Sequence, residues 1–280
     1  MIDKELEKFI KESLNEDIKD GDYTSLACIE ENTINAAHLI IKDNGVIAGI
    51  ELAILIFNYV DKNLKIKKII KDGDTVKKGD IALIVEGNSQ SILLAERLVL
   101  NCMQEMSAIA SKTRHICNLI SSTKTKVLDT RKTTPLNRKI QKWAVKIGGG
   151  YNHRYGLYDM IMIKDNHIDF SNGITNAIQK TKNYLLDKNK KLDIIVETRN
   201  INEINEVLKE GGIKRILLDN FNFKDTKEAV KIINKRFEIE SSGGITEDNI
   251  LEYAKCGVDY ISLGSLTHTI KNFDLSLKAI

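Results

Sequence analysis

The sequence is poor in residues that break, cross-link or anchor a chain. Its 280 residues include one proline, one tryptophan and four cysteines. The cysteines form no CxxC pair and no Cys/His metal spacing, so we expect reduced thiols packed in the core. No apolar run reaches the ~18 residues that span a bilayer, and the charged, amphipathic N-terminus does not resemble a signal peptide. These absences favour a cytoplasmic protein.

The sequence also lacks a large excess of charge. Its 42 basic and 39 acidic residues give a formal net charge of +3, which predicts no general attraction to nucleic acid or membranes. A hydrophobic content of 42% and a charged content of 29% are typical of a globular protein that buries a core. The length suggests one large domain or two ordinary ones.

The first third of the chain predicts a helix followed by a β-rich module. Apolar spacing indicates an amphipathic helix over residues 3–14, and residues 17–25 indicate a turn into irregular chain. Short β runs follow at residues 36–42, 45–52 and 81–87, with a helix at residues 54–60. The run DGDTVKKGDIALIVEG resembles the half-barrel of lipoyl and biotinyl carrier domains. It shows no exposed lysine flanked by small residues or methionine, so we interpret this module as structural.

A long helix is predicted over residues 91–122, where it would connect two domains. Arg97 lies within the apolar part of this helix. On spacing alone Arg97 is interpreted as a surface residue whose stem covers apolar neighbours. The alternative is that it binds an anion.

From about Thr125 apolar runs alternate with amphipathic helical segments. The runs are residues 125–130, 159–166, 192–198, 214–220, 237–244 and 259–265. Such runs are typical of parallel strands buried on both faces. The residues that end the last four, Glu197, Asp219, Ser241 and Gly264, are 22, 22 and 23 residues apart. This regular β/α repeat predicts a barrel or an open doubly wound sheet.

All six of these strand ends are polar or rich in glycine. A single acid after a strand often caps the next helix, but parallel barrels carry their active sites at the carboxyl ends of the strands. Six polar ends therefore favour an active site. They comprise Arg131 and Lys132; Lys164, Asn166 and His167; Glu197; Asp219 and Asn220; Ser242, Gly243 and Gly244; and Gly264 and Ser265.

The stretch from Asp129 to Ile168 is the best candidate for the floor of this site. It contains the only proline, the only tryptophan and the only Gly-Gly-Gly, and it is strongly cationic. Its strand-end cations, with His153 and Arg154, outnumber what one monophosphate needs, which indicates a second anion or a polycarboxylate.

The later strand ends suit a phosphorylated sugar. SSGGIT and SLGSLTHT offer glycine amides and hydroxyls before a helix, an arrangement that commonly binds phosphate in barrels. Carboxylates such as Glu197 and Asp219 can chelate Mg²⁺, bind sugar hydroxyls or stabilise a developing cation. We find no defensible Ser-His-Asp order and no Walker or Rossmann glycine pattern.

Together these motifs resemble the quinolinate phosphoribosyltransferase family, the carboxylating nicotinate-nucleotide pyrophosphorylases. The run TRKTTPLNRKIQKWAVKIGGGYNHRYGLYDMIMIKDNH is similar to the family signature. LNEDIKDGDYTS resembles the N-terminal motif, AERLVLNCMQEMSAIAS the linker helix, and VETRN, LLDNF, ESSGGI and SLGSLTHT the later strand ends. The resemblance extends over nearly the whole chain. One departure is Ala108, where the family pattern has glycine; on a helix it should affect packing more than chemistry.

The resemblance implies an α/β fold with two domains, assembled as a homodimer. An N-terminal α/β sandwich with the linker helix, residues 1–107, would precede an incomplete parallel α/β barrel, residues 108–268. A C-terminal tail, residues 269–280, would return to the first domain. The sandwich of one subunit would cover the barrel mouth of its partner.

The implied reaction converts quinolinate and phosphoribosyl pyrophosphate to nicotinate mononucleotide, pyrophosphate and CO₂ in de novo NAD biosynthesis, with Mg²⁺ and no organic cofactor. Lys132, Glu197 and Asp219 would be catalytic, and the two acids would hold Mg²⁺ mainly through substrate and water. Arg97 would reach the partner's site. The implied substrate-binding residues are Arg97, Arg131, Lys132, Thr133, His153, Arg154, Lys164, Glu197, Asp219, Ser242, Gly243, Gly244, Gly264, Ser265, Leu266 and His268.

Three other interpretations stay open at this point. A molybdenum-transport-associated paralogue shares the fold and would act on another substrate, although the intact cationic set favours quinolinate. A different phosphate-binding barrel enzyme, such as an isomerase or aldolase, would not explain so many cations. A non-enzyme, in which a carrier-like module is joined to a regulatory barrel, would require an acylated lysine.

Overall fold

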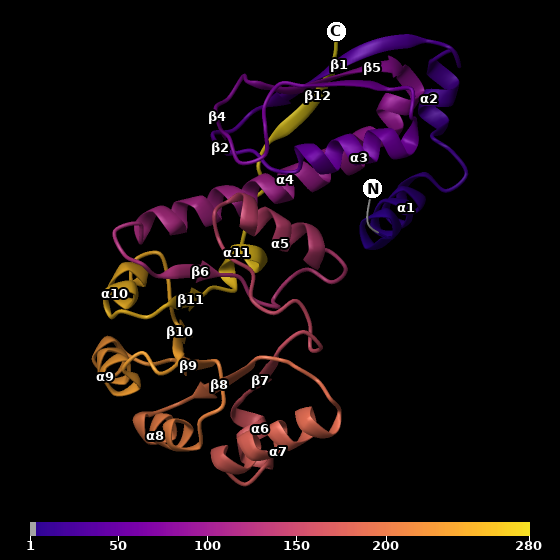
Figure 1. The fold of residues 1–280 in the computed structure, drawn as a ribbon. Helices are drawn as coiled ribbons and strands as arrows, with labels where there is room; N and C mark the ends of the chain where they lie inside the picture. Colours follow the sequence, from indigo (N-terminus) through magenta and orange to yellow (C-terminus); the bar gives the residue numbers. More distant parts are fainter. Residues whose placement is uncertain (1–3) are drawn as a thin grey trace. The chain divides into compact units, whose positions relative to one another are not determined.

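The computed structural model describes residues 4–280, which form two compact units (Figure 1). The first unit comprises the residues up to Arg114 together with Thr133–Gly149 and Ser265–Ile280. The second comprises His115–Lys132 and Gly150–Gly264. Within residues 4–280, no helix is both long and apolar enough to cross a bilayer.

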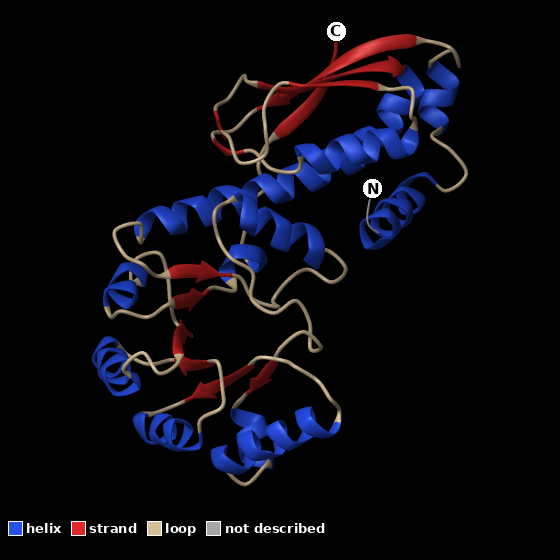
Figure 2. Ribbon diagram, in the orientation of Figure 1, coloured by secondary structure: helices blue, strands red, loops and turns tan. Residues whose placement is uncertain are grey.

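The first unit is built on a four-stranded antiparallel sheet with the order β12-β1-β5-β3, and β2 pairs separately with β4. Figure 2 shows α3 and α4 on one face of the larger sheet. The elements of this unit are α1 (Lys4–Ile18), α2 (Tyr23–Cys28), β1 (Ile34–Ile41), β2 (Gly45–Val46), α3 (Ile50–Val60), β3 (Lys65–Lys68), β4 (Thr75–Val76), β5 (Ile81–Asn88), α4 (Ser89–Leu119, continuing into the second unit), α5 (Arg138–Ile147), α11 (Ser265–His268) and β12 (Leu275–Ala279).

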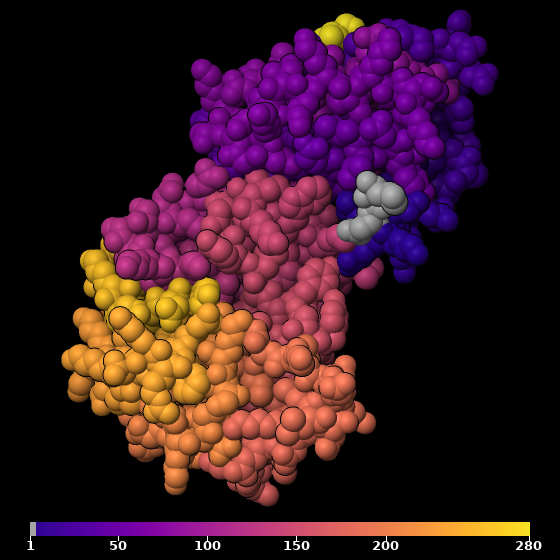
Figure 3. All heavy atoms as spheres, viewed as in Figure 1, coloured from indigo at the N-terminus to yellow at the C-terminus, as the bar shows by residue number. Residues whose placement is uncertain are grey.

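The C-terminal strand belongs to this sheet. β12 pairs with β1 in the register Leu277 opposite Leu39, so the last residues of the chain, yellow in Figure 3, emerge among the indigo residues of the first unit. Along β1 the side chains of Ala37, Leu39 and Ile41 are buried in alternation with more exposed neighbours. That period of two places one face of β1 against the core.

Two serines of α4 pair with extended backbone in the first unit as a strand would. The Ser107 hydroxyl accepts the N–H of Ala48 at 3.0 Å and lies 3.1 Å from its carbonyl oxygen. One turn later, Ser111 contacts the N–H and carbonyl of Val46 at 2.8 and 3.3 Å. Residues i and i+4 on a helix are about 6 Å apart and residues i and i+2 on an extended chain about 6.6 Å apart, so the two spacings match.

Two segments differ from the sequence-based expectation. Residues 17–25 were expected to lead into irregular chain, but α2 forms there because the Asp22 carboxylate accepts the N–H of Ser25 at 3.1 Å and caps the helix. Residues 45–52 were expected to be a strand, but β2 ends at Val46. The Asp72 carboxylate accepts the N–H of Ile50 at 2.8 Å, which satisfies the first turn of α3.

The predicted boundaries of the N-terminal helix and of the long helix lie close to the observed ones. The N-terminal helix continues to Ile18, four residues beyond its predicted end, and its predicted first residue, Asp3, lies outside the described residues. The long helix spans Ser89–Leu119, against the predicted 91–122.

The second unit is an open parallel barrel. Its six strands have the order β6-β11-β10-β9-β8-β7 and all pair in parallel, with β6 and β7 at the two edges. Figure 1 shows α8, α9 and α10 outside the curved sheet. The elements are β6 (Lys126–Leu128), β7 (Ile161–Ile163), α6 (Asp165–Phe170), α7 (Ile174–Asp187), β8 (Ile194–Thr198), α8 (Ile201–Glu210), β9 (Arg215–Asp219), α9 (Phe223–Ile233), β10 (Glu238–Ser242), α10 (Ile250–Lys255) and β11 (Tyr260–Ser262). The expected fold class, an N-terminal α/β domain followed by an incomplete parallel barrel, is confirmed.

Local sequence explains how these strands are followed by helices. Every residue of β8 is buried, as its continuous apolar run predicts. Asn200 and Asn222 then cap α8 and α9, accepting the N–H groups of Glu203 and Asp225 with their side chains. Asparagine at this position ends the extended chain and satisfies the first free amides of the helix.

The serine contacts of α4 predict a graded loss of stability. Ser107 and Ala48 are fully buried, so Ser107→Ala leaves two backbone groups without partners. We expect it to cost about 2–4 kcal/mol in the free energy of unfolding. Ser111→Ala, where the site is partly exposed, should cost less. Ser121→Ala, at an exposed position, is the control and should stay within about 0.5 kcal/mol. Chemical denaturation measures all three, and equal losses for Ser107 and Ser121 would contradict this account.

Candidate active site

A cavity of about 570 Å³ lies within the second unit, among the carboxyl ends of the parallel strands. Paired strands and alternating side chains bring residues from five strands and the segments after them to this place. The cavity is lined by Thr130, Arg131, Lys132, His153, Arg154, Met162, Lys164, Glu197, Leu217, Asp219, Asn220, Glu240, Ser242, Gly243 and Ser262.

One side of the cavity is cationic. Arg154 is only 8% exposed, and one of its terminal nitrogens donates to the carbonyl of Met160 at 3.2 Å. Burial, and then the nearby charge of Arg131, lower the pKa of Arg154, although Asp159 opposes them. Two guanidinium groups that repel each other in a cavity form a site that a bound anion would stabilise.

The cavity also carries carboxylates. Glu197 at the end of β8 is 8% exposed, and its oxygen lies 2.8 Å from the ammonium of Lys164. Asp219, the last residue of β9, accepts the side-chain amide of Asn220 at 2.7 Å. Both acids therefore face the cavity with one contact each to a flexible polar neighbour, and oxygens of both can meet a ligand.

Backbone contacts hold the cationic residues. The buried Asp129 carboxylate accepts the N–H of His153 at 2.8 Å. The Nδ1 atom of His153 in turn accepts the N–H of Arg154 at 2.7 Å. In the same way Nδ1 of His167 accepts the N–H of Lys164 at 3.0 Å. Each histidine fixes the backbone of a neighbouring cation.

The ends of β9 and β10 approach each other closely. Asn220 has a positive φ of 55°, and its N–H donates to the carbonyl of Ser242 at 2.9 Å. A Cβ atom on Gly243 would collide with the Asn220 side chain and lie 3.0 Å from its backbone nitrogen. Gly243 also has a φ of 85°, so glycine is required here on both counts.

The structure brings nine of the predicted site residues together. Arg131, Lys132, His153, Arg154, Lys164, Glu197, Asp219, Ser242 and Gly243 all line the cavity. Gly244 and Gly264 belong to the same unit but not to the lining.

Five predicted residues belong to the first unit. Arg97 is exposed on α4, where it borders a recess of about 380 Å³ against α1. The hydroxyl of Thr133 accepts Nε of Arg138 at 3.0 Å. Ser265, Leu266 and His268 form α11.

Six lining residues were absent from the implied substrate-binding set, although Asn220 had been named at a polar strand end: Thr130, Met162, Leu217, Asn220, Glu240 and Ser262. Two of them could have been found from the sequence. Leu217 and Glu240 precede the predicted Asp219 and Ser242 by two residues, and residues two apart on a strand face the same side. The remaining residues could be assigned to the cavity only once the pairing register between the strands was known.

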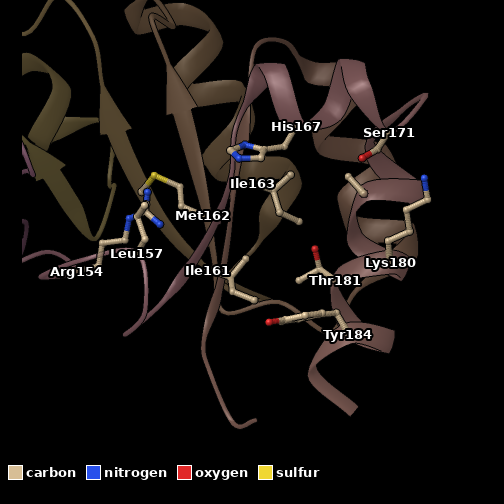
Figure 4. A pocket seen from close by; sticks show the side chains of 11 residues that line it. Arg154, Leu157, Ile161, Met162, Ile163, His167, Ser171, Lys180, Thr181 and Tyr184 are labelled. Atoms are coloured by element: carbon tan, nitrogen blue, oxygen red, sulfur yellow. The ribbon is translucent and has the colours of Figure 1, made fainter. Parts of the chain in front are cut away.

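A second cavity of about 370 Å³ lies beside the edge strand β7, against α6 and α7. Arg154 and Met162 border both cavities. Figure 4 shows these two side chains, with Leu157, at one side of it, and Ser171 and Lys180 at the other. Its lining is mainly apolar, with Ile161 and Tyr184 between the two sides.

Family models match almost the whole chain. The model described as "Quinolinate phosphoribosyl transferase, N-terminal domain" matches residues 22–107, and the model of the C-terminal domain of the same family matches residues 109–278.

Individual proteins with names from the same family are also similar to this chain. The chloroplastic carboxylating nicotinate-nucleotide pyrophosphorylase of Arabidopsis thaliana is 43% identical, over 98% of this chain and 82% of the relative. The probable carboxylating nicotinate-nucleotide pyrophosphorylase of Bacillus subtilis is 36% identical, over 98% and 93%. The solved structure of the nicotinate-nucleotide pyrophosphorylase from Francisella tularensis has a TM-score of 0.92 and 39% identity, covering 100% of this chain and 98% of that one.

The contact between β9 and β10 predicts unequal effects of two neighbouring substitutions. Gly243→Ala places alanine at a φ of 85° and Gly244→Ala at a φ of 63°, so the backbone strain is similar in the two variants. Only Gly243→Ala also collides with Asn220, since nothing lies within 4 Å of a Cβ on Gly244. We expect Gly243→Ala to lower the free energy of unfolding by about 1–3 kcal/mol more than its neighbour does. Urea denaturation of the two variants tests this. Equal losses in the free energy of unfolding would show that the Asn220 side chain can move aside without cost.

Proposed function

The chain belongs to the quinolinate phosphoribosyltransferase family, and we propose that its barrel cavity performs that family's reaction with the residues described above. Quinolinate and phosphoribosyl pyrophosphate are converted to nicotinate mononucleotide, pyrophosphate and CO₂, a step of NAD biosynthesis. The observation that carries the assignment of the cavity is that Arg131 and Arg154, whose charges repel, line the same cavity as Glu197 and Asp219. Nothing in the relatives supports the molybdenum-transport-associated alternative.

The cationic side is the proposed quinolinate site. Quinolinate carries two adjacent carboxylates, and a guanidinium fork binds a carboxylate through two parallel hydrogen bonds. Arg131 and Arg154 repel each other in the cavity, so a dianion between them offsets that repulsion. Lys132 and Lys164 add two further donors to the same space.

The acidic side is the proposed ribose and pyrophosphate site. When the ring nitrogen of quinolinate bonds to the ribose carbon, pyrophosphate leaves with the electron pair of the broken C–O bond. Positive charge develops on the ribose, and Glu197 and Asp219, which both line the cavity, are the proposed groups that stabilise it. Lys164 exchanges its contact with Glu197 for one with substrate in this scheme.

Decarboxylation then needs no organic cofactor. Bonding to ribose makes the pyridine nitrogen cationic. The C–C bond to the neighbouring carboxylate breaks, CO₂ leaves, and the electron pair stays on the cationic ring until a proton takes the vacated position. Lys132 is the proposed cation that holds the reacting anions during these steps, because it lies on the cavity wall in the segment that follows β6.

We propose Mg²⁺ as the inorganic cofactor, and the donor set fits it. Mg²⁺ usually binds one or two protein carboxylates together with substrate phosphates and water. Glu197 and Asp219 supply two carboxylates in one cavity. Within residues 4–280 no cluster of three or more His, Cys, Asp or Glu could hold a metal without such help. Bound there, Mg²⁺ would neutralise charge on the departing pyrophosphate.

The remaining residues are proposed from the family resemblance. Ser242, Gly243, Gly244 and Gly264 would bind the 5′-phosphate end of the substrate, with Thr133, Ser265, Leu266 and His268 completing the site. We further propose a homodimer in which Arg97 of one subunit completes the quinolinate site of the other. None of the four cysteines, all within residues 4–280, forms a disulfide, which suits the reducing cytoplasm, the proposed location.

The cationic side predicts selection of the dicarboxylate. Nicotinate lacks one carboxylate and leaves part of the cation group unpaired, so we expect quinolinate to be preferred by at least ~100-fold in kcat/KM, about 2.7 kcal/mol. Quinolinate alone should also raise the melting temperature of the wild-type protein. Arg154→Ala should lose that rise, whereas Arg236→Ala, which removes an exposed arginine elsewhere in the unit, should keep it. Equal turnover of nicotinate would overturn the proposed function.

The shared site predicts complementation between two inactive proteins. Arg97→Ala and Lys164→Ala should each abolish activity without unfolding the chain, because each removes a cation from a different part of one composite site. After subunit exchange, mixed dimers should contain one intact site and one doubly damaged site. Under random exchange in a twofold dimer, ~1/2 of the dimers should be mixed, and one of the two sites in each should be active. Activity should therefore recover towards a quarter of wild type.

The control for this experiment is Lys124→Ala, which removes one exposed cation and should leave activity unchanged. Mixing either inactive variant with itself should restore nothing. Mass spectrometry should first demonstrate subunit exchange. If activity then does not recover, Arg97 serves its own subunit or no site at all.

A further inference from the structure

A column of charged side chains runs through the interior of the barrel beneath the cavity. Arg215 at the start of β9 is 7% exposed, and Glu240 in the middle of β10 is 0% exposed. One terminal nitrogen of Arg215 lies 2.8 Å from Oε2 of Glu240. Two further nitrogens of Arg215 contact Oε2 of Glu238 at 3.1 and 3.0 Å. Barrel interiors are ordinarily filled by branched apolar side chains, so this column is unusual.

The upper end of the column is His153. Its Nε2 lies 3.2 Å from the same Oε2 of Glu240 that contacts Arg215. Its Nδ1 accepts the N–H of Arg154 at 2.7 Å. A ring nitrogen that accepts a hydrogen bond carries no proton, so the proton of the neutral ring is on Nε2 and faces Glu240. Nδ1 therefore makes a hydrogen bond within the protein, and Nε2 lies in close electrostatic contact with the Glu240 carboxylate.

Glu240 can fill this role because its carboxylate stays ionised. Burial works against ionisation, but the contacts with His153 and Arg215, and a hydrogen bond from Ser262, outweigh it and lower the pKa of Glu240. An ionised carboxylate only accepts hydrogen bonds, so it selects the histidine tautomer that has its proton on Nε2.

Two observations separate this role from that of a structural ion pair. Glu238 alone already provides Arg215 with two contacts, so Arg215 does not depend on Glu240 for a partner. Glu240 also lines the substrate cavity together with His153 and Arg154, whereas Glu238 does not.

We propose that Glu240 is a positioning residue for the quinolinate site: held by Arg215, it fixes His153 in its Nε2–H tautomer, and His153 then fixes the backbone of Arg154. His153 consequently acts by aiming the Arg154 guanidinium at a substrate carboxylate, and it does not donate a ring proton to the substrate. This inference rests on the proposed function of the cavity.

The test is Glu240→Gln, which keeps the size of the side chain and removes its charge. The glutamine amide can donate to Nε2 and so favour the opposite tautomer. We expect the KM for quinolinate to rise at least ~10-fold, while the KM for phosphoribosyl pyrophosphate stays within about twofold; tenfold corresponds to about 1.4 kcal/mol. Glu238→Gln is the matched control on the same strand. It also contacts Arg215 but not His153, and it should leave both KM values unchanged.

A spectroscopic measurement reads the tautomer without any turnover. The chain has five histidines, so ¹⁵N signals of His153 can be assigned by their loss in His153→Gln. The wild-type protein should show a protonated Nε2 and an unprotonated Nδ1 at His153. Glu240→Gln should abolish that pattern, and Glu238→Gln should keep it.

The outcomes are distinguishable. An unchanged tautomer in Glu240→Gln, or equal rises in both KM values, would overturn the positioning role and leave the proposed function standing. A wild-type protein that does not turn over quinolinate would overturn the proposed function itself. If Glu240→Gln does not fold, the double variant Arg215→Met/Glu240→Gln removes the buried pair together, which costs far less than breaking it, and the same readouts apply.

Discussion

The parallel register of the barrel strands is the constraint on which the rest of the site depends. Glu197 pairs across with Leu217, and Leu217 with Glu240. Because every second side chain on a strand faces the interior, each step of two residues moves one layer deeper into the barrel. Asp219 and Ser242 therefore meet at the ends of their strands, and Leu217 and Glu240 meet one layer deeper, where they still line the cavity. A slip of one residue in a strand would turn the side chain that it contributes to the cavity to the outside.

This geometry concentrates charge in a small volume, and the concentration determines what the cavity can bind. The pKa of Arg154 is lowered by burial and by Arg131, which means that its charged form is held at some cost. A ligand with two carboxylates offsets that cost, and a ligand with one does so only partly. The proposed selectivity for a dianion thus rests on a repulsion that is present before the ligand binds. Glu197 and Asp219 in the same cavity would suit a ligand group that becomes positive during the proposed reaction.

Much of this could be predicted from the sequence, because its signals were local. The apolar runs identified the parallel strands, and the polar residues after them identified nine of the cavity's lining residues. What the sequence did not reveal depended on contacts between distant segments. The strand expected at residues 45–52 became the start of α3 because Asp72, far along the chain, satisfies its first amide. The inward direction of Glu240 could be predicted from its strand, but its contacts could not, because Arg215 and His153 are distant in sequence. Arg97 on α4 was assigned by resemblance alone, since its expected ligand belongs to another subunit.

The charged column also bears on how stability and function are balanced in this fold. Replacing a buried ion pair by well-packed apolar side chains is often neutral or stabilising, so packing alone does not call for Arg215 and Glu240 inside the barrel. The Arg215 guanidinium additionally stacks over the Tyr260 ring at 3.9 Å, which limits its freedom to turn elsewhere. A rigid cation below and a histidine above leave the Glu240 carboxylate one arrangement in which both contacts are made. An apolar interior would pack as well, but it could not choose between the two tautomers of His153. Burying these charges costs energy, and in our proposal that cost is offset because the Arg154 guanidinium becomes oriented. A site needs such orientation if its two substrates must meet at one reacting bond.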